Sequence, residues 1–121
     1  MQNINILYVD DEPINLILFR SVFKNQYAIH TADSGSNGIK VLGEIGNIDI
    51  VISDMKMPGM DGLEFISRAR DLFPGITFFI LTGYDLTPEI QNSLDSGLVK
   101  RCFQKPMNIK DISDSISAII S

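Results

Sequence analysis

Short apolar runs alternate along the chain with segments whose apolar residues recur at helical spacing. The central run, Ile50–Ile52, is apolar at consecutive positions and rich in β-branched residues, and it leads directly towards Asp54. Such a run is typical of a strand that is buried on both faces of a parallel sheet. Four further runs, apolar or alternating, predict strands over residues 5–10, 27–32, 77–82 and 100–104.

Helices are predicted between these strands from apolar periodicity and from residues that favour helix ends. Pro13 suits a first helical turn, Asp61 with Glu64 resembles a capping box, and Gly97 suits a helix end. The expected helices span residues 13–25, 34–46, 61–73, 87–97 and 108 onward, and four glycines disfavour the second of them. Apolar residues recur at helical spacing in the first helix, at Leu18, Phe19, Val22 and Phe23. The expected buried side of the second helix is Ile39, Leu42 and Ile45, and one face of the last is lined by Ile109, Ile112, Ile116 and Ile119.

This alternation of strands and helices indicates parallel pairing with right-handed crossovers. We therefore expect an α/β fold, a flavodoxin-like doubly wound (βα)5 sandwich with strand order 2-1-3-4-5. A chain of 121 residues is expected to form a single domain, residues 1–121.

Composition narrows the possible functions. The net charge of −5 disfavours direct binding of nucleic acid, which needs a basic face. The one cysteine, Cys102, excludes an internal disulfide and a multi-cysteine metal site. No apolar stretch approaches the roughly 20 residues that cross a bilayer. The first residues also lack the pattern of a signal peptide. A cytoplasmic protein without a membrane partner is expected.

Residues that can carry chemistry follow most of the expected strands. In chain order they are Asp10 and Asp11 after the first strand, Asp54 at the third, Thr82 at the fourth and Lys105 after the fifth. With the first and third strands adjacent, the carboxylates converge where doubly wound folds bind ligands. Carboxylates this close repel one another unless a cation lies among them, and oxygen ligands favour magnesium. The nearby hydroxyl and ammonium groups complete an arrangement that suits a phosphoryl group.

These residues, in this order, resemble the receiver domain of two-component response regulators, the family that includes the bacterial chemotaxis regulator. The matching motifs are Asp10-Asp11, Asp54 within residues 54–62, Thr82 and Lys105-Pro106, and the resemblance covers residues 4–121. It implies a single receiver domain of a phosphorelay whose Asp54 accepts a phosphoryl group from a phosphohistidine. The domain would then signal by a change of conformation.

The resemblance also implies how magnesium is held. Asp11 would bind the ion directly and Asp10 chiefly through water. Asp54 itself and the backbone carbonyl of Lys56 would complete the protein ligands.

Lys105 would pair with Asp54 at rest and with a phosphoryl oxygen afterwards, while Thr82 would turn its hydroxyl onto another phosphoryl oxygen. The bond between Lys105 and Pro106 is the expected cis peptide. The implied partners are a sensor histidine kinase or a histidine phosphotransfer protein, and a downstream effector. Signalling, and any homodimer, would use the face made by the fourth helix, fifth strand and fifth helix. The implied enzymatic activity is at most self-phosphorylation and self-dephosphorylation.

The sequence departs from the family pattern at two positions, 102 and 83. Cys102 stands where the family usually has an aromatic residue, and strand alternation directs the following Phe103 to the opposite face, so the usual aromatic gating does not fit. Gly83 replaces a commoner alanine and leaves more room beside the phosphoryl group. Lys56 and Tyr84 are expected to tune the lifetime of the phosphoryl group.

Other interpretations stay open from the residues alone. Asp11 or Glu12 can be a simple helix N-cap, and Thr82 and Lys105 can be ordinary residues at strand ends. For the whole chain, one alternative is a pseudo-receiver, an interaction module that keeps the fold but accepts no phosphate. The other is an aspartyl-phosphate phosphatase, although such enzymes typically have a second acid where this chain has Lys56.

Overall fold

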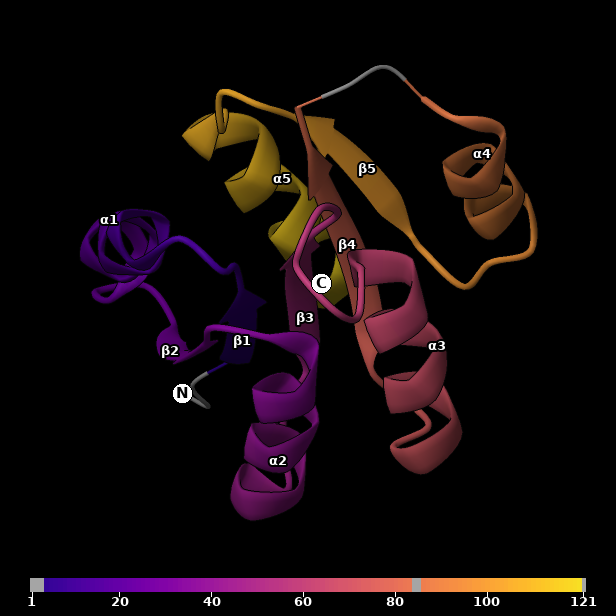
Figure 1. The fold of residues 1–121 in the computed structure, drawn as a ribbon. Helices are drawn as coiled ribbons and strands as arrows, with labels where there is room; N and C mark the ends of the chain where they lie inside the picture. The colour runs from indigo at the N-terminus through magenta and orange to yellow at the C-terminus, as the bar shows by residue number, and fades with distance from the viewer. Residues whose placement is uncertain (1–3, 84–85, 121) are drawn as a thin grey trace.

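The computed structural model describes residues 4–83 and 86–120, and it contains a parallel sheet with the strand order β2-β1-β3-β4-β5 (Figure 1). The strands are β1 (Asn5–Val9), β2 (Ala28–Ala32), β3 (Ile50–Asp54), β4 (Thr77–Thr82) and β5 (Arg101–Gln104). The helices are α1 (Pro13–Phe23), α2 (Gly35–Ile45), α3 (Gly62–Leu72), α4 (Pro88–Asp95) and α5 (Ile109–Ile120). The predicted fold class, strand order and sequence of elements are confirmed.

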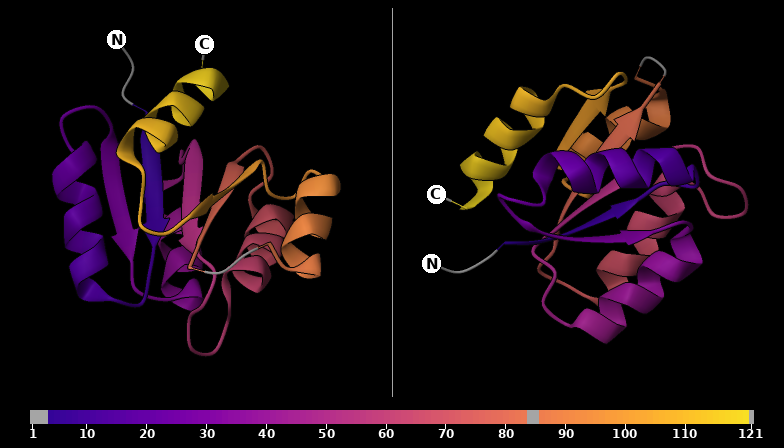
Figure 2. Two further views of the ribbon diagram at one scale, coloured as in Figure 1. Left: turned by 90° about the horizontal axis from the view of Figure 1, so that it is seen from above. Right: turned by 90° about the vertical axis from the view of Figure 1, so that its left-hand side faces the viewer.

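The helices cover both faces of the sheet, as the turned views of Figure 2 show. α1 and α5 pack on one face, where Phe19, Phe23 and Ile112 are buried. α2 and α3 pack on the other face with Leu42 and Phe65, and α4 lies on that same side. Within the described part of the chain, no helix has the length and apolar character of a membrane span.

The central strand β3 is buried on both faces, which explains why consecutive residues in it are apolar. Ile50 and Ile52 belong to the cluster under α1 and α5, Val51 belongs to the cluster under α2 and α3, and all are inaccessible to solvent. Side chains alternate between the faces of a strand, so a sheet covered on both sides needs apolar residues at every position. Each such side chain contributes about 1.5–3 kcal/mol by its burial. The next residue on the face of Ile52 is Asp54, so the apolar run ends in an acid.

Side chains cap the N-termini of four helices at positions where the sequence predicts that these helices begin. Ser34 accepts a backbone N–H at the start of α2 at 3.1 Å, and Asp61 accepts one at the start of α3 at 2.8 Å. Thr87 and Asn108 do the same for α4 and α5. α2 forms in spite of its glycines, and Gly46 ends it with φ of 84°, a conformation that glycine adopts without strain.

Ile45, expected on the buried side of the second helix, is exposed by 40%. It is the last residue of α2, at the end of the helix. Leu18 and Ile109 follow the apolar spacing of α1 and α5 but are exposed by 53% and 47%, and Ile14 and Ile17 on α1 are more exposed still. The prediction for Ile45 was wrong because helical periodicity marks an apolar stripe without showing how much of it a neighbouring element covers.

Gly62, the first residue of α3, approaches the backbone that carries Asp54. Its N–H donates to the carbonyl of Met55 at 2.8 Å, and a Cβ at this position would collide with the backbone carbonyl of Asp54. Any larger residue must therefore displace the chain directly after β3.

We expect Gly62→Ala to lower the free energy of unfolding by about 1–3 kcal/mol, the usual cost of overpacking. Gly43→Ala inside α2 is the matched control, because its Cβ would meet only the ring of Phe73, at 3.7 Å. There alanine should raise the free energy of unfolding by about 0.5–1 kcal/mol through helix propensity. Urea unfolding followed by circular dichroism measures both variants. Equal midpoints for the two would contradict the role given to Gly62.

Candidate functional site

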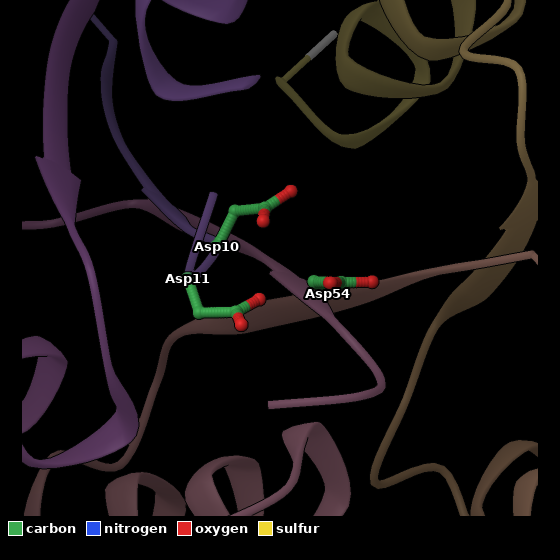
Figure 3. Close-up of side chains that lie close together, drawn as sticks. All are labelled: Asp10, Asp11 and Asp54. Carbon is green, nitrogen blue, oxygen red and sulfur yellow. The ribbon is translucent and has the colours of Figure 1, made fainter. Parts of the chain in front are cut away.

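The three acids identified in the sequence meet at the carboxyl end of the sheet. Asp10 follows β1 and Asp54 ends β3, and these two strands are direct neighbours. Figure 3 shows Asp10, Asp11 and Asp54 gathered there. One carboxylate oxygen of each lies within 4.8 Å of the others. The predicted convergence of these side chains is confirmed.

Asp54 forms an ion pair with Lys105, whose Nζ lies 3.0 Å from Oδ1 of Asp54. Burial raises the pKa of Asp54 above its ordinary value in spite of this ammonium, and the charges of Asp10 and Asp11 add to the rise. For Lys105, burial acts to lower the pKa, but the hydrogen bond to Asp54 and its charge outweigh that effect and raise it. The ammonium therefore stays charged beside a carboxylate that is only 5% exposed.

Asp10 is fully buried, and hydrogen-bond donors surround its carboxylate. The Tyr8 hydroxyl donates to Oδ2 at 2.7 Å and the Asn15 side-chain amide donates to the same oxygen at 3.1 Å. The backbone N–H of Glu12 donates to Oδ1 at 2.9 Å. Burial and the bond to Asp10 raise the pKa of Tyr8 far above its ordinary value, so its hydroxyl keeps the proton it donates. These bonds offset the desolvation that a buried carboxylate suffers.

The sequence did not identify Tyr8 and Asn15 as residues of the site. A signal existed for Tyr8, because it lies two residues before Asp10 on the same face of a buried strand and its hydroxyl needs a partner. Asn15 gave no such signal, because its hydrogen bond to Asp10 depends on how α1 packs against the sheet. Glu12 occupies the N-cap position of α1, but its side chain makes no capping hydrogen bond.

A hollow of about 370 Å³ lies over Asp54. Its lining consists of Asp11, Glu12, Asp54, Lys56, Thr82, Gly83 and Lys105, which includes every predicted site residue except the buried Asp10. A Cβ added to Gly83 would meet nothing within 4 Å, so there is room beside the site as expected. Tyr84 lies outside the described residues.

Thr82 connects this hollow with α4. Alternation along β4 places Phe78 and Ile80 in the cluster under α2 and α3, and Thr82 follows them with the same period. Thr82 also lines a larger cavity, about 720 Å³, together with Met57 on the loop after β3 and Ile90 on α4. A movement of the Thr82 side chain would therefore change the shape of both the hollow over Asp54 and the cavity beside α4.

The last strand confirms the predicted separation of Cys102 and Phe103. Phe103 is buried in the cluster under α1 and α5, with its ring edge-on to that of Phe79 at 5.4 Å between centroids. Cys102 packs against the opposite cluster. The peptide between Lys105 and Pro106 is cis, as predicted.

The donor set fits a magnesium ion. The carboxylates offer only oxygen atoms, which are the ligands that magnesium prefers, and Asp11 is the most accessible of the three residues. Asp54 belongs to the acidic cluster and is also ion-paired with Lys105, so its carboxylate lies between the other two acids and an ammonium.

Comparisons with known proteins agree with this geometry. The family model described as the response regulator receiver domain matches residues 6–117. Sporulation initiation phosphotransferase F of Bacillus subtilis (strain 168) is 35% identical over 117 residues, which cover 96% of this chain and 93% of that protein. Sensor histidine kinase RcsC of Escherichia coli (strain K12) is 35% identical over 113 residues, 93% of this chain but 12% of the kinase. The response regulator TrrA of Thermotoga maritima, solved in complex with Mg²⁺-BeF, gives a TM-score of 0.80 at 29% identity, covering 96% of this chain and 98% of that one.

The raised pKa of Asp54 predicts that this residue costs stability. The folded state holds the proton of Asp54 more tightly than the unfolded state. The free energy of unfolding therefore falls as pH rises from the unfolded pKa of about 3.9 through the higher folded pKa. We expect Asp54→Asn to be more stable than the wild type at pH 7 in EDTA, with the gain disappearing as pH falls towards the unfolded value.

Urea unfolding across this pH range measures the difference. Asp71→Asn is the control, because it removes the same charge from an exposed position on α3. An Asp54→Asn variant that is less stable than the wild type at pH 7 would contradict the electrostatic account.

Proposed function

The chain belongs to the response regulator receiver domain family of two-component signalling, and we propose that Asp54 accepts a phosphoryl group from a phosphohistidine donor. The observation that carries the proposal is the ion pair between Lys105 and Asp54 at 3.0 Å beside a cluster of carboxylates. Receiver domains are signalling proteins. Self-phosphorylation and self-dephosphorylation are the only catalytic activities we assign.

In the proposed reaction, an oxygen of the Asp54 carboxylate attacks phosphorus and forms a new P–O bond. The P–N bond of the phosphohistidine breaks, and its electron pair returns to the imidazole. The Lys105 ammonium then moves from the carboxylate to a phosphoryl oxygen, and the Thr82 hydroxyl donates to another. Magnesium, when bound, supplies positive charge next to the phosphoryl oxygens.

We propose that Asp11 binds magnesium directly and Asp10 chiefly through water, with Asp54 and the backbone carbonyl of Lys56 as further ligands. The greater accessibility of Asp11 and the full burial of Asp10 support this division. Lys56 lines the same hollow as Asp11 and Asp54. The Mg²⁺-BeF complex of the Thermotoga maritima response regulator supports the same choice of ion.

The proposed donor is a sensor histidine kinase or a histidine phosphotransfer protein, and α1 offers it an apolar surface. Ile14 and Ile17 are exposed by 69% and 66%, and Leu18 lines a hollow together with Lys105. A phosphohistidine must come within bonding distance of Asp54, so its protein has to cover the residues around the pocket. Exposed apolar side chains at that rim gain free energy when a partner buries them.

For the output we propose the face formed by α4, β5 and α5, for a downstream effector or a homodimer. Thr82 lines both the acidic hollow and the cavity next to α4, which supports transmission towards that helix. β5 places Cys102 on the face of Thr82 and the aromatic Phe103 on the opposite face, so we propose that the threonine acts without Phe103.

The direct test is incubation with acetyl phosphate and magnesium, followed by intact mass. We expect the wild type to gain the mass of one phosphoryl group, whereas Asp54→Ala and the wild type in EDTA gain none. Asp71→Ala, which removes an exposed acid, should be modified like the wild type. A wild type that gains no mass from acetyl phosphate or from a phosphohistidine protein would favour a pseudo-receiver. Continuous turnover of a phosphomonoester would favour a phosphatase.

A second prediction concerns the lifetime of the phosphoryl group, which we propose Lys56 and Tyr84 tune. Lys56 lines the hollow over Asp54, where an attacking water must enter. The double variant Lys56→Ala/Tyr84→Ala should change the rate of phosphoryl loss severalfold while still accepting one group. Mass spectrometry over time after removal of the donor measures this rate. An unchanged rate would remove both residues from this role.

A further inference from the structure

We propose that Tyr8 and Asn15 are positioning residues of the magnesium site, which hold the Asp10 carboxylate so that one lone pair of Oδ1 faces the cation or its bound water. The inference rests on the proposed function, because it concerns how this chain presents its buried acid to the ion. It goes further in assigning a role to side chains outside the acidic cluster.

The hydrogen bonds of Asp10 distinguish its two oxygens. Oδ2 accepts from both the Tyr8 hydroxyl, at 2.7 Å, and the Asn15 amide, at 3.1 Å, which occupies both of its lone pairs. Among the described residues, Oδ1 accepts the backbone N–H of Glu12, at 2.9 Å, and no other hydrogen bond, which leaves one lone pair. Asp10 can therefore offer the ion or its water a single oxygen in a fixed direction.

Packing holds the Tyr8 hydroxyl in place. Its ring is 2% exposed and stacks on the ring of Phe19 from α1, with 4.2 Å between centroids and 8° between planes. Phe19 is itself fully buried and packs against Phe23 at 4.8 Å. The donor to Asp10 thus comes from a rigid aromatic stack between β1 and α1, and Asn15 adds a second donor from the first part of the same helix.

Removal of the Tyr8 hydroxyl should weaken magnesium binding more than removal of the Asn15 amide. Tyr8 is buried, so removal of its hydroxyl takes from Oδ2 its shorter hydrogen bond and leaves the Asn15 amide as the remaining side-chain donor among the described residues. Asn15 is partly accessible, so water can take over its weaker contact. Groups that orient metal ligands typically change metal affinity by about 10- to 100-fold when they are removed.

The test is a magnesium titration followed by amide NMR of the wild type, Tyr8→Phe and Asn15→Ala. Tyr8→Phe keeps the aromatic stack and removes only the hydroxyl. We expect it to raise the Kd for Mg²⁺ about tenfold, and Asn15→Ala to raise it less. Before magnesium is added, the Glu12 amide proton should shift in Tyr8→Phe, because it reports directly on the orientation of Oδ1. Tyr27→Phe, which removes a hydroxyl from a ring packed near Phe23, is the control and should leave both quantities unchanged.

The outcomes separate this inference from the proposed function. A wild type that binds no magnesium overturns the metal site itself. If the wild type binds magnesium but Tyr8→Phe has an equal or lower Kd, the positioning role is overturned and the site stands. An equal rise in Kd for Tyr27→Phe would also overturn it. Should Tyr8→Phe fail to fold, Asn15→Ala provides the test. If its Kd for Mg²⁺ and the chemical shift of its Glu12 amide proton both equal those of the wild type, the positioning role is overturned.

Discussion

The gathering of three carboxylates at one end of the sheet, two of them buried, is the constraint to which the rest of the structure responds. Asp54 and Asp10 are both buried, so neither can rely on water to stabilise its charge. The ammonium of Lys105 opposes the charge of Asp54 directly, and neutral donors satisfy Asp10. Burial nevertheless raises the pKa of Asp54 in spite of Lys105, and the charges of Asp10 and Asp11 add to the rise. A divalent cation among the carboxylates would oppose this rise by stabilising their charged forms.

The parallel sheet makes this arrangement possible with few specialised residues. Because β1 lies next to β3, the acids that end these strands become neighbours although they are far apart in sequence. Strand alternation then decides which side each group serves. Tyr8, Asp10 and Asp54 share the face of α1 and α5, whereas Thr82 belongs to the face of α4. The side chains of the site therefore lie on both faces of the sheet, at its carboxyl end.

The sequence predicted the strands, helix starts and convergent acids well, because each depends on local patterns or on one topological rule. The burial of Ile45 was predicted wrongly, since tertiary packing sets how much of an apolar helix face is covered. The hydrogen bonds of Asp10 were missed for a related reason. A tyrosine in an apolar strand indicates that its hydroxyl has a partner, but only the docked helix identifies Asn15 as the second donor.

The most direct test that the acidic cluster binds a phosphoryl group together with magnesium is fluorine NMR of the wild type with beryllofluoride, a mimic of the phosphoryl group, in the presence and absence of magnesium. We expect resonances of bound beryllofluoride when magnesium is present and their loss when EDTA removes it. Bound resonances that persist unchanged in EDTA would contradict this expectation. So would a protein that shows no bound signal at saturating magnesium.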